Sequence, residues 1–153
     1  MIRLDIPGRE TIELHHAVFD INGTLAIDGI PVSGIVERLK ELGMQLSLHA
    51  VSAGTHGNMP ELEQILGFPI HLINSAEEKT QYVQQLHPTQ VIAIGNGTND
   101  IGMLRVAALG VAVLGKEGMA ARVLQSADVV VLNPIDAIDL LLKPKRLVAT
   151  LRE

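Results

Sequence analysis

Apolar residues in this chain fall into short runs, separated by stretches in which they recur at helical spacing. Short, mostly apolar runs are typical of strands that are buried on both faces of a parallel sheet. Helical segments between such runs are expected when helices connect parallel strands. We therefore predict core strands at 17–21, 45–51, 70–73, 90–94, 110–114 and 128–132.

The segments between the strands carry helix signals. Apolar residues recur every three or four positions between Ser33, a predicted N-cap, and Gly43. Ser75 and Glu78 have the spacing of a capping box, which predicts the start of another helix. The alternation predicts an α/β fold, a three-layer Rossmann-like parallel sheet with helices on both faces. The predicted helices cover 34–42, 60–66, 75–86, 101–108, 119–124 and 135–142.

Two hairpins are predicted outside this repeat. In residues 2–14, apolar and polar positions alternate on both sides of a Pro–Gly turn, which predicts the first hairpin. Asp28–Gly29 is a tight-turn signal, which predicts the second hairpin, a flap at about 25–33. No repeat or linker is visible, so we expect one domain over 1–153. The basic segment 143–153 is interpreted as a solvated tail or docked terminal helix rather than a binding surface.

Composition narrows the possible partners and sites. The chain has 153 residues, 47% apolar but only 2% aromatic, so the core must be built from aliphatic side chains. The absence of Cys excludes disulfides and thiolate metal sites. A net charge of −5 argues against a nucleic-acid partner, and the apolar runs are shorter than the ~20 residues of a membrane span. We expect a cytoplasmic protein without a nucleic-acid or membrane partner.

Polar, glycine-containing loops follow three predicted strands. They begin at Asp20, at Ser52 and at Gly95, and the last one ends in Asp100. Because the carboxyl ends of parallel strands meet at one edge of a sheet, these side chains should converge there, with Lys79 on the intervening helix. Two carboxylates can hold Mg²⁺ and a lysine can hold a phosphate, which matches aspartyl-phosphate chemistry.

These segments resemble the four motifs of the haloacid dehalogenase-like superfamily, in order and spacing. The motifs are Asp-Ile-Asn-Gly-Thr-Leu at 20–25, Ser52, Lys79 and Gly-Asn-Gly-Thr-Asn-Asp at 95–100. Residues 95–112 are most similar to the phosphorylation domain of P-type ATPases. The resemblance implies a capless haloacid dehalogenase-like fold and a Mg²⁺-dependent phosphohydrolase that acts on a phosphorylated substrate.

The resemblance also implies a role for each matching residue. Asp20 would be the nucleophile that accepts the phosphoryl group, and Lys79 would neutralise the charge that builds up there. Ser52 would hydrogen-bond the phosphoryl group. The implied phosphate site comprises Ser52, Ala53, Lys79 and Thr24, the implied metal site comprises Asp20, Asn22, Asn96 and Asp100, and the supporting residues are Asn99 and Gly23.

Two positions depart from the usual pattern of the family. Asn22 stands where phosphatases of the superfamily usually have an Asp that acts as general acid and base, and an amide cannot do this. Losing such a group typically costs about 10²–10⁴-fold in rate. Asn96 replaces a second Asp and removes one charge from the metal site. We therefore expect slow hydrolysis and weakened Mg²⁺ binding.

The segment lengths leave no room for a cap domain, so the flap is the only predicted cover for the site. An open site suits a large substrate or a homo-oligomer in which a neighbouring subunit closes it. The sequence does not identify the substrate.

Other interpretations remain open at this point. The chain could be a weakened phosphate- and metal-binding regulator or subunit, or a nucleotide-binding flavodoxin-like domain without phosphoryl transfer. The six His form no metal pattern, and we expect structural or surface roles for them, with His56 the one nearest a site loop. Residues 115–118 lack the spacing of a P-loop and are interpreted as a turn.

Overall fold

The computed structural model describes residues 1–54 and 57–153. Its centre is a six-stranded sheet in the order β10–β9–β8–β3–β6–β7, in which all neighbouring strands are parallel. The predicted parallel α/β fold is therefore confirmed. The strands are β3 (His16–Asp20), β6 (Ser47–Ser52), β7 (Ile70–Leu72), β8 (Val91–Gly95), β9 (Leu109–Val113) and β10 (Val129–Val131).

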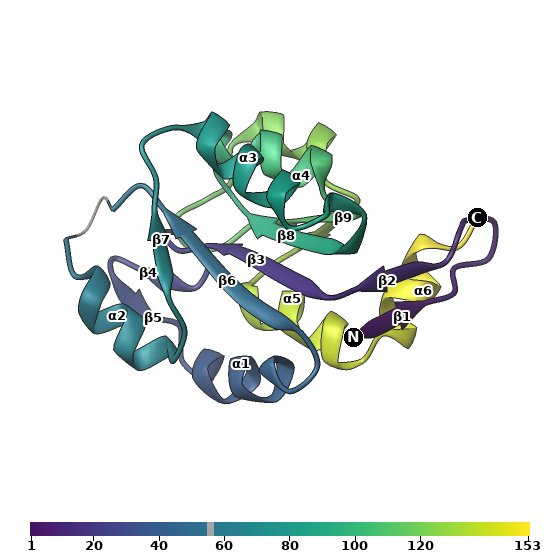
Figure 1. The fold of residues 1–153 in the computed structure, drawn as a ribbon, viewed down its shortest axis with the longest axis horizontal. Helices are drawn as coiled ribbons and strands as arrows, with labels where there is room; N and C mark the ends of the chain where they lie inside the picture. Colours follow the sequence, from purple (N-terminus) through teal and green to yellow (C-terminus); the bar gives the residue numbers. More distant parts are fainter. Residues whose placement is uncertain (55–56) are drawn as a thin grey trace.

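Helices cover both faces of this sheet (Figure 1). α3 and α4 pack on one face, and α1 and α5 pack on the other. The helices are α1 (Ile35–Gly43), α2 (Met59–Leu66), α3 (Ala76–Gln85), α4 (Ile101–Val106), α5 (Pro134–Leu142) and α6 (Lys145–Leu151), with short 3₁₀ helices η1 (Pro88–Gln90), η2 (Thr98–Asp100) and η3 (Ala121–Ser126).

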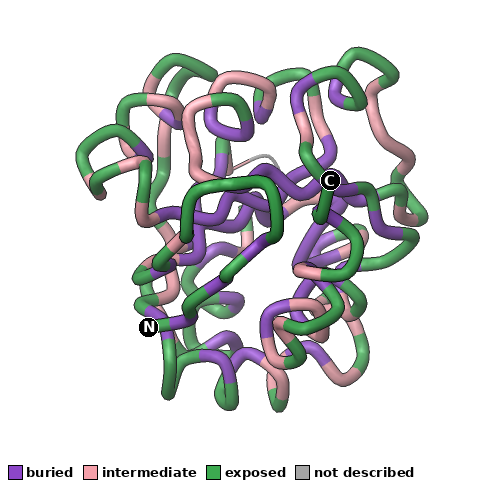
Figure 2. Tube along the Cα trace, turned by 90° about the vertical axis from the view of Figure 1, so that its right-hand side faces the viewer, coloured by how far each residue is buried: buried purple, intermediate pink, exposed green. Residues whose placement is uncertain are grey.

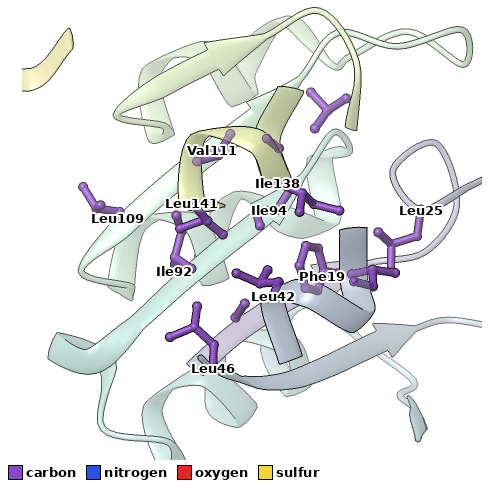
Figure 3. Close-up of a cluster of buried hydrophobic side chains, with 14 of the residues drawn as sticks. Phe19, Leu25, Leu42, Leu46, Ile92, Ile94, Leu109, Val111, Ile138 and Leu141 are labelled. Carbon is purple, nitrogen blue, oxygen red and sulfur yellow. The ribbon is translucent and has the colours of Figure 1, made fainter. Parts of the chain in front are cut away.

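The core consists of two apolar clusters, one on each side of the sheet. On the α1 and α5 side, Phe19 of β3 and Ile94 of β8 lie among Leu42 and Leu141 from the helices (Figure 3). The preceding residue of β3, Val18, belongs to the cluster under α3 and α4, because successive side chains of a strand point to opposite faces. The central strands are therefore buried on both faces (Figure 2).

The predicted flap is present as the antiparallel pair β4 (Ala26–Ile27) and β5 (Ile30–Pro31). The Nδ2 of Asn58, just before α2, donates a 2.9 Å hydrogen bond to the carbonyl of Gly29 at the flap tip. At the other end of β3 lies a second hairpin, β1 (Ile2–Leu4) and β2 (Ile12–Leu14), on which α6 packs. The basic segment is thus a docked helix.

Three local predictions differ from the structure. Gly34 rather than Ser33 is the N-cap of α1, and no side chain caps that helix. The helix predicted at 119–124 is present as the 3₁₀ helix η3 rather than as an α-helix, and it begins after Ala120, whose backbone N–H donates to the carbonyl of Asn96. α4 ends at Val106, where the chain turns into extended backbone that leads to β9.

The capping box at the start of α3 forms only in part. The Ser75 hydroxyl accepts a 3.2 Å hydrogen bond from the N–H of Glu78. The Glu78 carboxylate, however, accepts from the N–H of Asn74 rather than from that of Ser75. The helix still begins where the sequence predicts.

Two absences apply to the part of the chain that the structure describes. No helix there is long and apolar enough to cross a membrane. No cap domain is inserted between the described strands, and β4 and β5 form the only insertion directly after β3.

Candidate active site

Three strands end side by side at the edge where the site residues converge. Asp20, the last residue of β3, is in register with Val51 of β6, so that Ser52 is the next residue along the adjacent strand. On the other side of β3, β8 ends at Gly95 and leads into η2, which ends in Asp100. The parallel arrangement therefore brings the three loops together, as expected at the carboxyl ends of such strands.

Lys79 connects two of these loops. Its Nζ donates to Asp20 Oδ1 at 2.6 Å and to Asp100 Oδ1 at 2.7 Å. Its side chain is 0% exposed, as is that of Asp100, whereas the Asp20 side chain keeps 9% exposure. Asp20 is thus the member of the cluster that is open to a ligand.

The position of Lys79 is unfavourable for its helix taken alone. It lies in the first turn of α3, where the helix dipole disfavours a cation. The two carboxylates supply the compensating charge, and burial of such a charge is tolerated only when it is paired. The cluster carries two negative charges and one positive charge when all three groups are ionised.

The environment shifts the pKa values within this cluster. Burial, followed by repulsion from Asp100, raises the pKa of Asp20 to about 7, although Lys79 partly offsets both effects. Burial alone would lower the pKa of Lys79, but attraction to the two carboxylates outweighs it and holds that pKa above its ordinary value. Lys79 therefore stays charged, and Asp20 takes up a proton more readily than an ordinary carboxylate does.

The loop after β8 holds the Asp100 carboxylate with backbone groups. Its Oδ2 accepts hydrogen bonds from the N–H of Asn96 at 3.0 Å and of Gly97 at 2.9 Å. A Cβ on Gly95 would lie 2.6 Å from this carboxylate, so only glycine fits at that position. Both oxygens of Asp100 are therefore fixed, one by Lys79 and one by the loop.

Asn96, in the loop after β8, contacts the turn at residues 115–118 through its side-chain amide. Its Nδ2 donates a 3.0 Å hydrogen bond to the carbonyl of Gly118, which leaves its Oδ1 for another partner. A Cβ on Gly23 would lie 2.3 Å from that Nδ2, and Gly23 has a φ of +81°. Gly23 is thus required both by the backbone turn and by the close approach of Asn96.

The loop after β6 presents hydrogen-bond donors beside Asp20. Ser52 is fully buried, and its Oγ accepts a 3.1 Å hydrogen bond from the N–H of Gly54. Because the hydroxyl accepts here, its own proton remains free for donation to a ligand. Ala53 is exposed at the start of this loop. His56 lies outside the described residues.

The remaining predicted residues contribute unequally. Thr24 is fully buried, and its Oγ1 has no hydrogen-bond partner. The loop is held instead by the backbone N–H of Thr24, which donates a hydrogen bond to the carbonyl of Ile21. The Oδ1 of Asn22 is likewise buried without a partner. Asn99 is exposed on η2, with its Oδ1 next to Gly97.

One part of the site edge was not anticipated from the sequence. Residues 115–118 do form a turn, but the turn also contacts the site loops through Gly118, which bonds Asn96, and through Gly115, which approaches Gly23. A signal was available, because this segment follows β9 and so lies at the same edge of the sheet.

Comparisons with known sequences and solved structures identify relatives of this chain. The sequence profile of the haloacid dehalogenase-like hydrolases matches residues 73–135, a segment that includes Lys79 and Asp100. An uncharacterised protein of Methanocaldococcus jannaschii is 48% identical over 64 residues, which make up 42% of this chain and 69% of that protein. The chain belongs to the haloacid dehalogenase-like superfamily.

Solved structures share the fold of this superfamily member at low sequence identity. A cobalt-bound deoxy-D-mannose-octulosonate 8-phosphate phosphatase from Haemophilus influenzae has a TM-score of 0.72 and 14% identity, over 88% of this chain and 90% of that one. The Moraxella catarrhalis 3-deoxy-D-manno-octulosonate 8-phosphate phosphatase, in complex with magnesium, phosphate and KDO, has a TM-score of 0.66 and 18% identity, over 91% and 94%.

A third structure, a phospho-aspartyl intermediate analogue of phosphoserine phosphatase, has a TM-score of 0.67 and 16% identity, over 82% of this chain and 97% of that one. At such identities the three likenesses establish the three-layer fold.

Proposed function

We propose that this protein is a phosphohydrolase that forms an aspartyl-phosphate on Asp20. The observation that carries the proposal is the buried Lys79, held at 2.6 Å from Asp20 and 2.7 Å from Asp100. A buried cation between two carboxylates costs desolvation energy, which makes a purely structural role a poor explanation. Membership of a hydrolase superfamily supports the same conclusion.

In the proposed reaction, an oxygen of Asp20 attacks the phosphorus of a phosphate monoester. The bond from phosphorus to the ester oxygen breaks, and the alcohol leaves after taking up a proton. Water then attacks the phosphorus of the aspartyl-phosphate, which releases phosphate and restores the Asp20 carboxylate. Lys79 orients this carboxylate and offsets negative charge, while the Ser52 hydroxyl and the Ala53 backbone donate to the phosphoryl oxygens.

Proton transfer limits this reaction. The amide of Asn22 cannot donate a proton to the leaving alcohol or remove one from water, so both transfers depend on solvent. We therefore propose slow turnover and a long-lived aspartyl-phosphate, as in the P-type ATPases that the sequence resembles.

We propose Mg²⁺ as the cofactor, held by Asp20, Asp100, Asn96 and the backbone of Asn22. Carboxylate and amide oxygens are the donors that Mg²⁺ prefers, and the unpartnered Oδ1 of Asn22 adds another oxygen nearby. When bound, Mg²⁺ would act as a Lewis acid on the phosphate oxygens. No group of three or more His, Cys, Asp or Glu suited to a metal occurs among the described residues, so the site has few charges and binding should be weak.

The test uses p-nitrophenyl phosphate and a panel of phosphorylated metabolites, with and without Mg²⁺. Asp20→Asn should lower activity by about 10⁶-fold, because it removes the covalent nucleophile. Glu41→Gln, an exposed carboxylate on α1, is the matched control and should not change activity. Activity that persists in Asp20→Asn would refute the proposal.

A second candidate is a regulator that binds phosphate without turning it over. The observation in its favour is the pair of amides, Asn22 and Asn96, where acids would speed hydrolysis and tighten metal binding. Asn22→Asp should then raise hydrolysis by about 10²–10⁴-fold, because it restores the missing proton donor. Brisk hydrolysis by the unchanged protein would contradict this candidate.

A further inference from the structure

A groove of about 600 Å³ lies beside the candidate active site. Three segments line it: the flap, the turn at Gly115 and Lys116, and the segment that follows β10 and enters α5. Its volume is within the range of small-molecule sites, which is about 300–1,000 Å³.

The groove adjoins the site loops through the turn at Gly115, one of its lining residues. A Cβ on Gly115, which lines the groove, would lie 3.5 Å from the carbonyl oxygen of Gly23, three residues after Asp20. The same turn ends at Gly118, whose carbonyl accepts from Asn96. A molecule in the groove would therefore lie against the turn that contacts both the nucleophile loop and the Asp100 loop.

The lining of the groove is mostly apolar. Ile27 and Ile30 of the flap face Leu132 and Pro134 beyond β10. Ile30 is 70% exposed and Leu132 is 72% exposed, which leaves two large aliphatic side chains in water at one location. Paired exposure of this kind at the rim of a pocket favours an apolar ligand.

The charges of the groove do not favour an anion or a cation. Its two charged lining residues, Asp28 and Lys116, have opposite signs. Neither forms a salt bridge with another of residues 1–54 and 57–153. The formal charge of the lining is therefore zero. Apart from Asp28 and Lys116, only Ser33 and Asn133 bring polar side chains to the lining, so the many hydroxyl groups of a sugar would find few hydrogen-bonding partners there.

We infer that this groove binds the leaving group of the substrate, and that the leaving group is an uncharged alkyl or aryl alcohol. The inference rests on the proposed function, because it places the phosphate at Asp20 and the organic part in the groove. It names a substrate class: phosphate monoesters of apolar alcohols, in preference to phosphorylated sugars.

A homologous series of alkyl phosphates, from ethyl to hexyl, tests this inference. We expect kcat/KM to rise about fourfold for each added methylene, in line with the free energy of burying a CH₂ group. Glucose 6-phosphate should be a poorer substrate than hexyl phosphate. Ile30→Asn and Leu132→Asn should each flatten the dependence on chain length. Ile65→Asn, on the exposed side of α2 and outside the groove, should leave it unchanged.

Alkylphosphonates separate this inference from the proposed function, because their phosphorus–carbon bond is not hydrolysed. Calorimetric affinity that rises with chain length, and that Leu132→Asn flattens, supports the groove even if no ester is turned over. Hydrolysis without any chain-length dependence overturns the groove while leaving the phosphohydrolase intact. Light scattering that shows a dimer which Ile30→Asn dissociates would also overturn it, because a second copy would then occupy the groove.

Discussion

Two polar clusters attach α3 to the sheet, and they do so by different chemistry. Lys79, near the start of the helix, bridges Asp20 and Asp100. Tyr82, about one turn further along, bonds His49 Nδ1 at 2.9 Å through its hydroxyl. The other ring nitrogen of His49 lies 3.1 Å from Nδ1 of His16, at the start of β3.

The clusters differ in charge and in burial. The lysine cluster is charged and almost completely buried, whereas the histidine cluster is partly exposed. Burial, followed by repulsion from His16 and His71, lowers the pKa of His49 to about 4, so this cluster is neutral at ordinary pH. The histidine cluster shows that this helix also contacts the sheet through neutral polar groups. A buried charged cluster one turn away costs desolvation energy that a neutral contact does not, which favours a requirement of function over one of the fold.

The largest expected effect is that of removing the charge of Lys79. Lys79→Met leaves two buried carboxylates facing each other, and we expect the free energy of unfolding to fall by about 3 kcal/mol at about pH 8. Phosphohydrolase activity should be lost as well. Urea denaturation measures the first effect, and hydrolysis of p-nitrophenyl phosphate measures the second.

Two variants control this experiment. Lys40→Met, at an exposed position of α1, should change stability by less than about 0.5 kcal/mol. Asp20→Asn combined with Lys79→Met should recover part of the lost stability, because only one carboxylate then remains. A Lys79→Met protein as stable as the unchanged one would show that the two carboxylates do not need the charge of Lys79.

A smaller effect is expected from acidification of the histidine cluster. The pKa of His49 is about 4 in the folded protein and about 6.5 when unfolded, so the unfolded chain binds more protons between these values. The stability that His49 contributes is therefore complete above about pH 6.5 and is lost as the pH falls toward 4. The pKa of His16 is lowered as well, chiefly by burial, which acts in the same direction.

Urea denaturation at about pH 7.5 and about pH 5 measures this dependence. The unchanged protein should lose more stability on acidification than His49→Gln, which keeps hydrogen-bonding groups but cannot titrate. An equal loss in both proteins would mean that other groups carry the acid sensitivity.

The smallest effect should come from the tyrosine hydroxyl. Tyr82→Phe leaves Nδ1 of His49 without its partner and should lower the free energy of unfolding by about 1 kcal/mol. The ring can keep its contact with His71, whose centroid is 4.8 Å away. Activity should not change, because Lys79 retains both of its carboxylates. A loss of activity with unchanged stability would instead connect the histidine cluster to the active site.

The sequence predicts the charged cluster better than the neutral one, for a physical reason. Asp20 and Ser52 end a strand and Asp100 lies in the loop after one, and a parallel sheet brings the carboxyl ends of its strands to one edge whatever their exact register. The contact of His16 with His49 depends on the alignment of β3 with β6, which pairs His16 with Ser47, and on the face that each side chain takes. Apolar periodicity alone does not fix that alignment.

Other differences have local causes. Ser33 is a residue type that often caps helices. In the structure, however, the chain after the flap turns through Gly34 in a left-handed conformation, and Gly34 is the N-cap of α1. The bond of Asn96 to Gly118 depends on where the turn after β9 lies, which the spacing of the motifs does not specify. Contacts between loops that are distant in the sequence are therefore not predicted by sequence patterns.

The order of the strands has a consequence for how the chain folds. β3 pairs on one side with β6, and on the other with β8, which comes much later in the chain. Contacts between distant segments form slowly, because the entropy of closing a long loop must be overcome first. Asp20 therefore meets Lys79 and Asp100 only after the second half of the chain has docked. A phosphate analogue that binds this site would select molecules in which both halves are joined, and would slow their separation.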